Sequence, residues 1–244
     1  NAECHYGLVT GDPQKIKSII LFHQENMGLC SFHLPLLLFT LVQLIVTQNH
    51  LFCKADPTDG FTPVPISQSN FQIQKPYDVP VNQRYSFIDG VHKFWVFKTD
   101  KPHTTTSQTK PRCEIRITGH DYSSGVWQFE GNFYVPSGSS GVSIMQVFGG
   151  SPSSTTLMLR VYNGDLYYYR EKLIESNIYN RWFRLNVIHD VGASKLEVYI
   201  NGNLKHEPSG RGGDHYYFKF GVYAQDNESD RMESRWRGVK LFNK

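Results

Sequence analysis

Apolar and polar residues alternate in short segments through most of the chain after residue 91. In WFRLNVIHD (182–190) and KLEVYIN (195–201), every second residue over most of the segment is apolar. Alternation with period two places one set of side chains on each face of a β-strand. Similar segments rich in aromatic and β-branched residues predict strands at 92–98, 113–119, 126–135, 143–149, 156–162, 165–170, 182–190, 195–201, 216–225 and 234–242.

Turn-forming residues separate these predicted strands. The dipeptides Asn163-Gly164 and Asn201-Gly202 are typical of tight hairpin turns, and residues 136–141 are rich in Ser and Gly. Residues 56–83 are rich in Pro, Asp and Gln and are expected to run as extended, irregular chain. Many short strands with such turns predict an all-β fold, a jelly-roll β-sandwich of two antiparallel sheets.

An apolar run lies near the beginning of the chain. Residues 34–46, LPLLLFTLVQLIV, are too short to span a bilayer but suit the apolar region of a secretory signal. We therefore expect an upstream extension at 1–26, a signal peptide at 27–55 and a mature domain at 56–244. The alternative is an ordinary buried N-terminal helix.

Removal of a signal peptide would leave Cys113 as the single cysteine of the mature domain. The domain would then have no internal disulfide, which a domain of this size can tolerate because burial rises with chain length. The sequon at Asn227 predicts glycosylation on the secretory route. The destination is expected to be the vacuole or the cell exterior, including the cell wall, with no membrane span in the mature form.

Composition argues against several classes of function. The net charge of +3 is small and scattered, and no run of five Lys or Arg occurs, so nucleic-acid binding is disfavoured. No pair of histidines has metal-ligand spacing and no glycine-rich phosphate loop is present, so neither a metal nor another cofactor is expected. We expect a monomer.

The segment PRCEIRI at 111–117 carries charges at alternate positions. In a strand, Arg112, Glu114 and Arg116 share one face, while Cys113 and Ile115 lie on the other with the core. Two guanidinium groups with a carboxylate between them form a candidate site for acidic ligands, since a guanidinium binds a carboxylate through two hydrogen bonds. Glu114 is expected to hold the two arginines in place.

Two other predicted strands also have a polar face. On strand 143–149, Gln146 and Phe148 share a face. If these faces adjoin the arginine face in one sheet, they form a patch that would bind carboxylates; the alternative is an ordinary solvated sheet surface. On strand 216–225 the polar face comprises Tyr217, Lys219, Gly221, Tyr223 and Gln225, and the glycine is expected to let another group approach the backbone.

Three stretches resemble the signature blocks of the alginate lyase 2 family, polysaccharide lyase family 7. The family blocks R-x-E-x-R, Q-I/V-H and Y-F-K-x-G-x-Y-x-Q correspond here to 112–116, 146–148 and 217–225. More closely, residues 56–244 resemble the plant citrate-binding proteins of the same superfamily, in stretches such as YSSGVWQFEG, SGVSIMQVFG and NIYNRWFRLNVIHD. The resemblance implies a secreted or vacuolar plant protein with a jelly roll of the concanavalin-like lectin/glucanase type and a concave groove.

One position departs from the family pattern. The family's lyases carry a His where this chain has Phe148, and a phenyl ring cannot accept the proton that β-elimination removes. By the resemblance, Tyr223 matches the acid/base tyrosine, and Arg116 and Gln146 would neutralise the uronate carboxylate. A mechanism with Tyr223 as both base and acid stays open if neighbouring cations lower its pKa. The sequence leaves open whether the chain is an enzyme.

Three hypotheses follow. The leading one is a protein that binds citrate, a related polycarboxylate or an acidic sugar. Its rivals are a weak or altered polyuronate lyase centred on Tyr223 and a polysaccharide-binding module without chemistry. In the leading hypothesis Arg112, Arg116 and Lys219 pair with carboxylates, and Gln146, Tyr223 and Gln225 hydrogen-bond hydroxyls.

His189 is a candidate replacement for the missing base. His189 is in phase with apolar neighbours and is interpreted as a core or edge histidine. His120 and His215 lie near predicted strand ends and are interpreted as surface residues.

Overall fold

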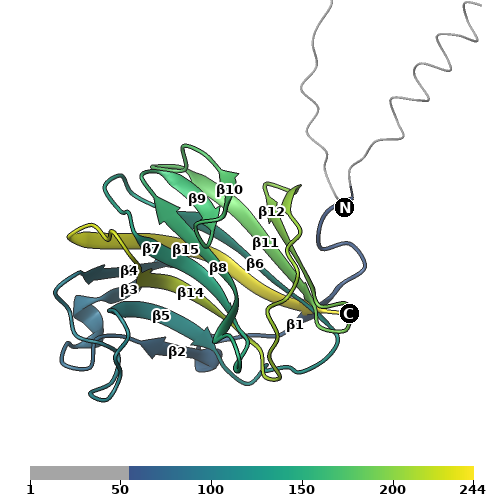
Figure 1. Ribbon diagram of the computed structural model, residues 1–244, viewed down its shortest axis with the longest axis horizontal. Helices are drawn as coiled ribbons and strands as arrows, with labels where there is room; N and C mark the ends of the chain where they lie inside the picture. The colour runs from purple at the N-terminus through teal and green to yellow at the C-terminus, as the bar shows by residue number, and fades with distance from the viewer. Residues whose placement is uncertain (1–54) are drawn as a thin grey trace, which may run out of the picture. The chain divides into compact units, whose positions relative to one another are not determined.

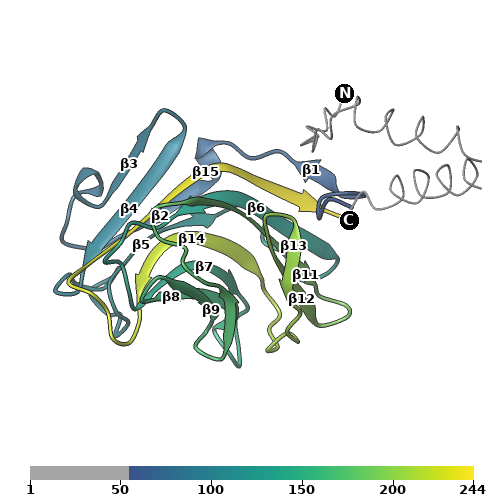
Figure 2. The same cartoon turned by 90° about the horizontal axis from the view of Figure 1, so that it is seen from above.

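The computed structural model describes residues 55–244. The predicted extension at 1–26 and the predicted signal peptide, apart from Ala55, lie outside the described residues. The described chain forms a jelly-roll β-sandwich in which two antiparallel sheets pack face to face (Figures 1 and 2). Within this range, no helix is long and apolar enough to cross a membrane.

One sheet has eight strands in the order β13-β12-β11-β6-β15-β4-β3, with β1 added beside β15. Its longest strand, β15, pairs with β4 and β6, which are distant in sequence. The bounds are β1 Thr62–Val64, β3 Tyr85–Ile88, β4 Val91–Phe97, β6 Val126–Tyr134, β11 Trp182–Asp190, β12 Lys195–Ile200, β13 Asn203–His206 and β15 Arg231–Asn243.

The other sheet has seven strands in the order β10-β9-β8-β7-β14-β5-β2. In Figure 2 it curves so that its hollow side faces away from the eight-stranded sheet. Two short 3-10 helices, η1 at Gln68–Asn70 and η2 at Val81–Gln83, lie in the first part of the domain. The bounds are β2 Phe71–Gln74, β5 Arg112–Ile117, β7 Val142–Phe148, β8 Thr155–Tyr162, β9 Asp165–Tyr168, β10 Lys172–Glu175 and β14 Tyr217–Ala224.

The all-β prediction is confirmed, and each of the ten predicted strands is present with ends shifted by a few residues. The expectation that 56–83 is wholly irregular is wrong, because β1 and β2 lie there. The strands β3, β10 and β13 were also not predicted. These five strands are only three or four residues long and are exposed or half-buried at all but one position, so they lack the apolar alternation that marks a buried strand.

The core lies between the sheets and is rich in aromatic rings. Phe220 of β14 contacts Phe129 of β6 and Trp236 of β15, with ring centroids 5.8 and 5.7 Å apart. All three side chains are fully buried, and such aromatic contacts add to the stabilisation from apolar burial. The apolar face of β14 thus fixes the strand to the opposite sheet and turns its other face outward.

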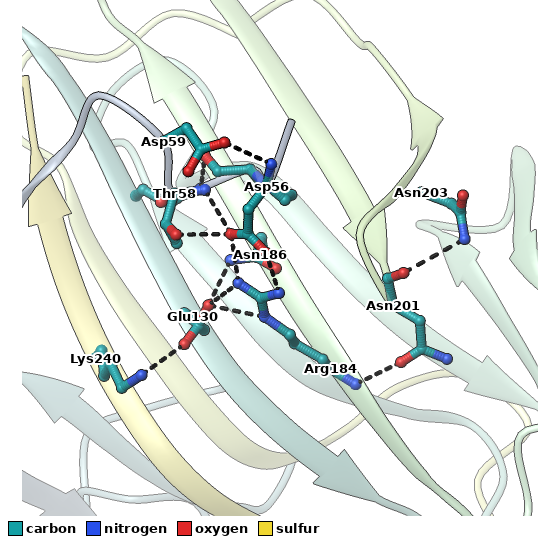
Figure 3. A network of polar contacts seen from close by, with 11 residues as sticks. Asp56, Thr58, Asp59, Glu130, Arg184, Asn186, Asn201, Asn203 and Lys240 are labelled. Atoms are coloured by element: carbon teal, nitrogen blue, oxygen red, sulfur yellow. Dashed lines mark hydrogen bonds and ion pairs between the residues drawn. The ribbon is translucent and has the colours of Figure 1, made fainter. Parts of the chain in front are cut away.

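A polar network on the eight-stranded sheet holds the start of the described chain (Figure 3). The guanidinium of Arg184 on β11 donates to both carboxylate oxygens of Asp56, at 2.5 and 2.7 Å. It also donates to Glu130 on β6 at 2.6 and 2.9 Å, and Lys240 on β15 reaches the same carboxylate at 3.0 Å. This hydrogen bonding with Arg184 lowers the pKa of Asp56 well below its usual value.

Candidate functional site

The three strands with predicted polar faces are neighbours in the seven-stranded sheet, in the order β7-β14-β5. Lys219 on β14 lies directly opposite Arg116 on one side and Gln146 on the other. Tyr223 lies opposite Arg112. The predicted juxtaposition is confirmed, and we call this surface the cationic face: Arg112, Glu114, Arg116, Gln146, Tyr217, Lys219 and Tyr223.

Glu114 is the centre of the cationic face and is fully buried. Its carboxylate accepts a hydrogen bond from Lys219 Nζ at 2.7 Å, and Arg112 Nη1 lies 3.4 Å from the same oxygen. The amide of Gln146 donates to the other oxygen. Burial lowers the pKa of Lys219, against the opposing effect of Glu114. Glu114 therefore neutralises part of the positive charge within the protein itself.

Arg116 is held differently from the sequence prediction. Glu114 does not pair with it; instead its guanidinium donates to Asp121, which follows β5. The same carboxylate oxygen of Asp121 lies 2.7 Å from Nε2 of His215. His215 is largely exposed, as predicted, but it lies at the edge of the cationic face. Asp121 was missed because it follows the strand in a loop, where alternation gives no information.

Both arginines stack on tyrosine rings of β14. The guanidinium carbon of Arg112 lies 3.8 Å from the ring centroid of Tyr223, and that of Arg116 lies 3.9 Å from Tyr217. Phe148 stacks on Tyr217, with centroids 4.6 Å apart and planes 11° apart. The residue in place of the family's His therefore continues a row of stacked groups across the sheet.

The close approach to the backbone that was predicted at Gly221 is present. Its φ of +141° is rarely adopted by other residues, and an added Cβ would lie 2.4 Å from the carbonyl oxygen of Cys113 and 2.7 Å from Cα of Glu114. The close approach is therefore made by β5 rather than by a ligand. A register irregularity between Phe220 and Tyr223 on the β7 side accompanies it.

One predicted site residue, Gln225, does not join these contacts. Gln225 comes directly after β14, and its side-chain amide donates hydrogen bonds to the backbone carbonyls of Tyr223 and Ala224, at 3.3 and 2.9 Å. His189 is buried, and its Nδ1 lies 3.0 Å from the hydroxyl of Tyr122, as expected for a core histidine. Burial lowers the pKa of His189 to about 4.

The face extends further than predicted, to Arg160 on β8. Met158 lies opposite Gln146 in the sheet, and Arg160, two residues later, shares its side. The guanidinium of Arg160 contacts Met158 Sδ at 3.1 Å and lies 5.1 Å from the ring centroid of Tyr169. Sequence reasoning missed Arg160 because alternation in TLMLRVY gives the side of the strand on which it lies but not the pairing of β8 with β7.

Buried polar atoms without a hydrogen-bond partner are concentrated here. Such atoms are uncommon in folded proteins and call for an explanation. Within residues 55–244 there are nine of them on side chains, and six belong to residues on or beside the cationic face. These six are Gln74 Oε1, His103 Nδ1, Arg112 Nε, Arg116 Nε, Asp121 Oδ1 and Arg160 Nε.

A separate depression of about 530 Å³ lies on the eight-stranded sheet. It is lined by residues of β6, β11 and β12, among them Val126, Asp190 and Lys195, and by the first described residues. Its charged groups include both signs, and it contains none of the predicted site residues. Because the depression and the cationic face share no residue, substitutions can distinguish a ligand bound at one from a ligand bound at the other.

Asn227, the predicted glycosylation site, is exposed in the turn after β14. With its amide oriented so that Oδ1 faces Arg170, it accepts hydrogen bonds from the guanidinium at 3.0 and 3.2 Å. The neighbouring Glu228 pairs with Lys110 at 2.8 Å. The exposed position keeps glycosylation of Asn227 as a prediction.

Comparisons with known proteins agree with this architecture. Residues 64–243 match the alginate lyase family model. A citrate-binding protein from Hevea brasiliensis is 53% identical over 214 residues, covering 87% of each chain.

Solved structures show the same fold at low identity. An alginate lyase of polysaccharide lyase family 7, AlgAT5, superposes with a TM-score of 0.59 at 18% identity, covering 77% of this chain and 98% of its own. An alginate lyase from Corynebacterium sp. gives 0.57 at 16% identity, covering 71% and 94%. The chain belongs to the alginate lyase family.

Proposed function

We propose that this protein binds citrate or a related polycarboxylate, or an acidic sugar, on its cationic face, and that its lyase machinery is degenerate. The observation that carries the proposal is the set of unpartnered guanidinium donors there: Nε of Arg112, Arg116 and Arg160. Buried donors of this kind form strong hydrogen bonds with carboxylate oxygens.

The charge balance supports an anionic ligand. Four cations (Arg112, Arg116, Lys219 and Arg160) share this side of the sheet with the two carboxylates of Glu114 and Asp121, so two positive charges remain when all are ionised. Citrate is a compact tricarboxylate that suits closely spaced cations.

The relative that is called a citrate-binding protein supports citrate as the first ligand to test. Phe148 supports binding without elimination, since it stacks on Tyr217 and offers no lone pair for a proton. Ion pairing of this kind is screened by salt, so the affinity is expected to fall as ionic strength rises.

The test is calorimetric titration of citrate into the wild-type protein and Arg116→Gln. Loss of the guanidinium is expected to weaken citrate binding about tenfold or more, since charge-assisted hydrogen bonds are each worth about 1.5–3 kcal/mol. Arg237→Gln is the matched control, because Arg237 is also stacked on an aromatic ring, Trp182 at 4.4 Å, but lies on the other sheet. Equal affinities in all three proteins would contradict the proposal.

A weak or altered polyuronate lyase is the second candidate, favoured by one observation. Tyr223 lies on the cationic face beside Arg112, and within residues 55–244 its hydroxyl has no hydrogen-bond partner. A free hydroxyl beside carboxylate-binding groups is the arrangement that proton transfer to a glycosidic oxygen requires.

Elimination is measured by the ultraviolet absorbance of unsaturated products from a panel of polyuronates. A flat trace is expected for the wild-type protein, and growth of absorbance that Tyr223→Phe abolishes would favour the lyase. Phe148→His tests whether the face lacks only its base, since activity gained in this variant would show that the other groups are already placed.

We also propose that the protein travels the secretory route, to the vacuole or the cell exterior. The apolar run at 34–46 supports this proposal. Sequencing the N-terminus of the protein purified from its native tissue tests it: a start near Asp56 is expected, and a start upstream of residue 34 would contradict it.

A further inference from the structure

The loop that joins β4 to β5, residues 98–111, brings a histidine to the cationic face. The loop is anchored at two points. The backbone N–H of Tyr77 donates to the carbonyl of Pro102 at 3.0 Å. Lys110 Nζ donates to the carbonyl of Gln225 at 2.9 Å and to the carboxylate of Glu228 at 2.8 Å. His103 therefore lies next to a fixed residue, Pro102, in a tethered loop.

The imidazole of His103 interacts with the centre of the cationic face. It is half-buried, and its Nδ1 is buried without a hydrogen-bond partner among the described residues. The charged groups that act on it are Arg112 and Glu114 of β5 and Lys219 of β14. A ring with a buried, unpartnered nitrogen thus lies within electrostatic range of the residues that would bind an acid.

Burial and the two cations lower the pKa of His103 below its ordinary value, while Glu114 opposes the change. The imidazole is therefore neutral near pH 7. A bound polycarboxylate would reverse this balance by adding negative charge close to the ring.

We propose that His103 is a recognition residue of the same site, whose imidazole hydrogen-bonds a carboxyl group of the bound acid and takes up a proton from solvent as the anion binds. The proposal rests on the proposed function, because it takes citrate as a ligand of the cationic face. Nδ1 supplies the contact: it accepts from a protonated carboxyl group or, once protonated, donates to a carboxylate.

This coupling fixes the direction of the pH dependence. The free protein holds His103 neutral and the complex favours its protonated form. Citrate binding is therefore accompanied by proton uptake at pH values between the pKa of His103 in the free protein and its pKa in the complex. Citrate affinity should therefore rise as the pH falls through this window. Each unit by which citrate raises the pKa of His103 gives up to about a tenfold gain in affinity.

The test is titration of citrate at about pH 6 in two buffers that differ in ionisation enthalpy, which reports the protons taken up. Wild-type protein is compared with His103→Gln and with His206→Gln. The second is a matched control, since His206 is also a half-buried histidine whose pKa burial lowers, but it lies on the eight-stranded sheet. Any change in the protonation of citrate itself contributes equally to the proton uptake measured with all three proteins.

The wild type and His206→Gln are expected to take up protons on binding and to bind citrate several-fold more tightly than His103→Gln. His103→Gln is expected to lack this proton uptake. Nuclear magnetic resonance titration of the imidazole provides a second measurement in the unmodified protein, where citrate should raise the pKa of His103 and leave that of His206 unchanged. Equal proton uptake in His103→Gln, or an unmoved His103 pKa, would overturn the role of His103 alone. Absence of citrate binding by the wild type would overturn the proposed function as well.

Discussion

Removing the ammonium group of Lys219 should destabilise the protein strongly, because it would leave the Glu114 carboxylate buried with weaker partners. The two groups are 2.7 Å apart, and their side chains are 4% and 0% exposed. At an effective dielectric constant of about 20, their attraction is about 6 kcal/mol before the cost of desolvation is subtracted. The measured cost of removing one partner from a buried pair is about 3–5 kcal/mol.

Lys219→Met is expected at the lower end of this range, about 3 kcal/mol, because Gln146 and Arg112 still contact the carboxylate. Urea unfolding followed by tryptophan fluorescence measures the change. Lys195→Met is the matched control: Lys195 pairs with Glu197 at the similar distance of 2.8 Å but is 43% exposed, so solvent screens the pair and its loss should cost much less than that of Lys219.

A double-mutant cycle tests the reasoning further. Glu114→Gln is expected to cost about as much as Lys219→Met, and the double variant about 3 kcal/mol less than the sum, since neither charge is then left alone. If Lys219→Met costs no more than Lys195→Met, or the two changes at the cluster are additive, the central role of Glu114 is wrong.

Three further predictions concern residues around the site. The folded-state pKa of His189 lies at about 4, below the ordinary 6.5, so burial of the neutral ring contributes up to about 3 kcal/mol of stability that is lost as the pH falls from about 6.5 to about 4. His189→Gln should flatten that part of the pH–stability curve. The variant should keep the similar contribution of His92, whose pKa also lies at about 4. Gly221→Ala should destabilise by more than about 3 kcal/mol in urea unfolding, whereas Gly202→Ala, with nothing near its Cβ, should cost about 1 kcal/mol. Arg184→Ala removes the guanidinium between two carboxylates and should lower the unfolding free energy by about 1–2 kcal/mol; an unchanged midpoint would contradict the structural role of this network.

The strands of the site could be predicted because alternation is a local property. Arg112, Glu114 and Arg116 share a face in any extended strand, and Lys219 and Gln146 follow the same rule. The order β7-β14-β5 depends on long-range pairing, so that part of the site came from the family resemblance and the structure, not from periodicity.

Loop residues could not be predicted in the same way. Asp121 and His103 reach the site from segments with no periodicity, and only the fold brings them to the arginines. For Gly221 the sequence indicates a close approach to the backbone, but only the fold shows that β5 makes it. Distances across the sheet decide which carboxylate pairs with which arginine.

A crystal structure of the protein with citrate tests the proposed binding site most directly. We predict citrate on the cationic face, with carboxylate oxygens within hydrogen-bond distance of Nε of Arg112 and Arg116. Citrate in the depression lined by Val126 and Lys195 on the other sheet, or none at a concentration that saturates the calorimetric titration, would contradict it.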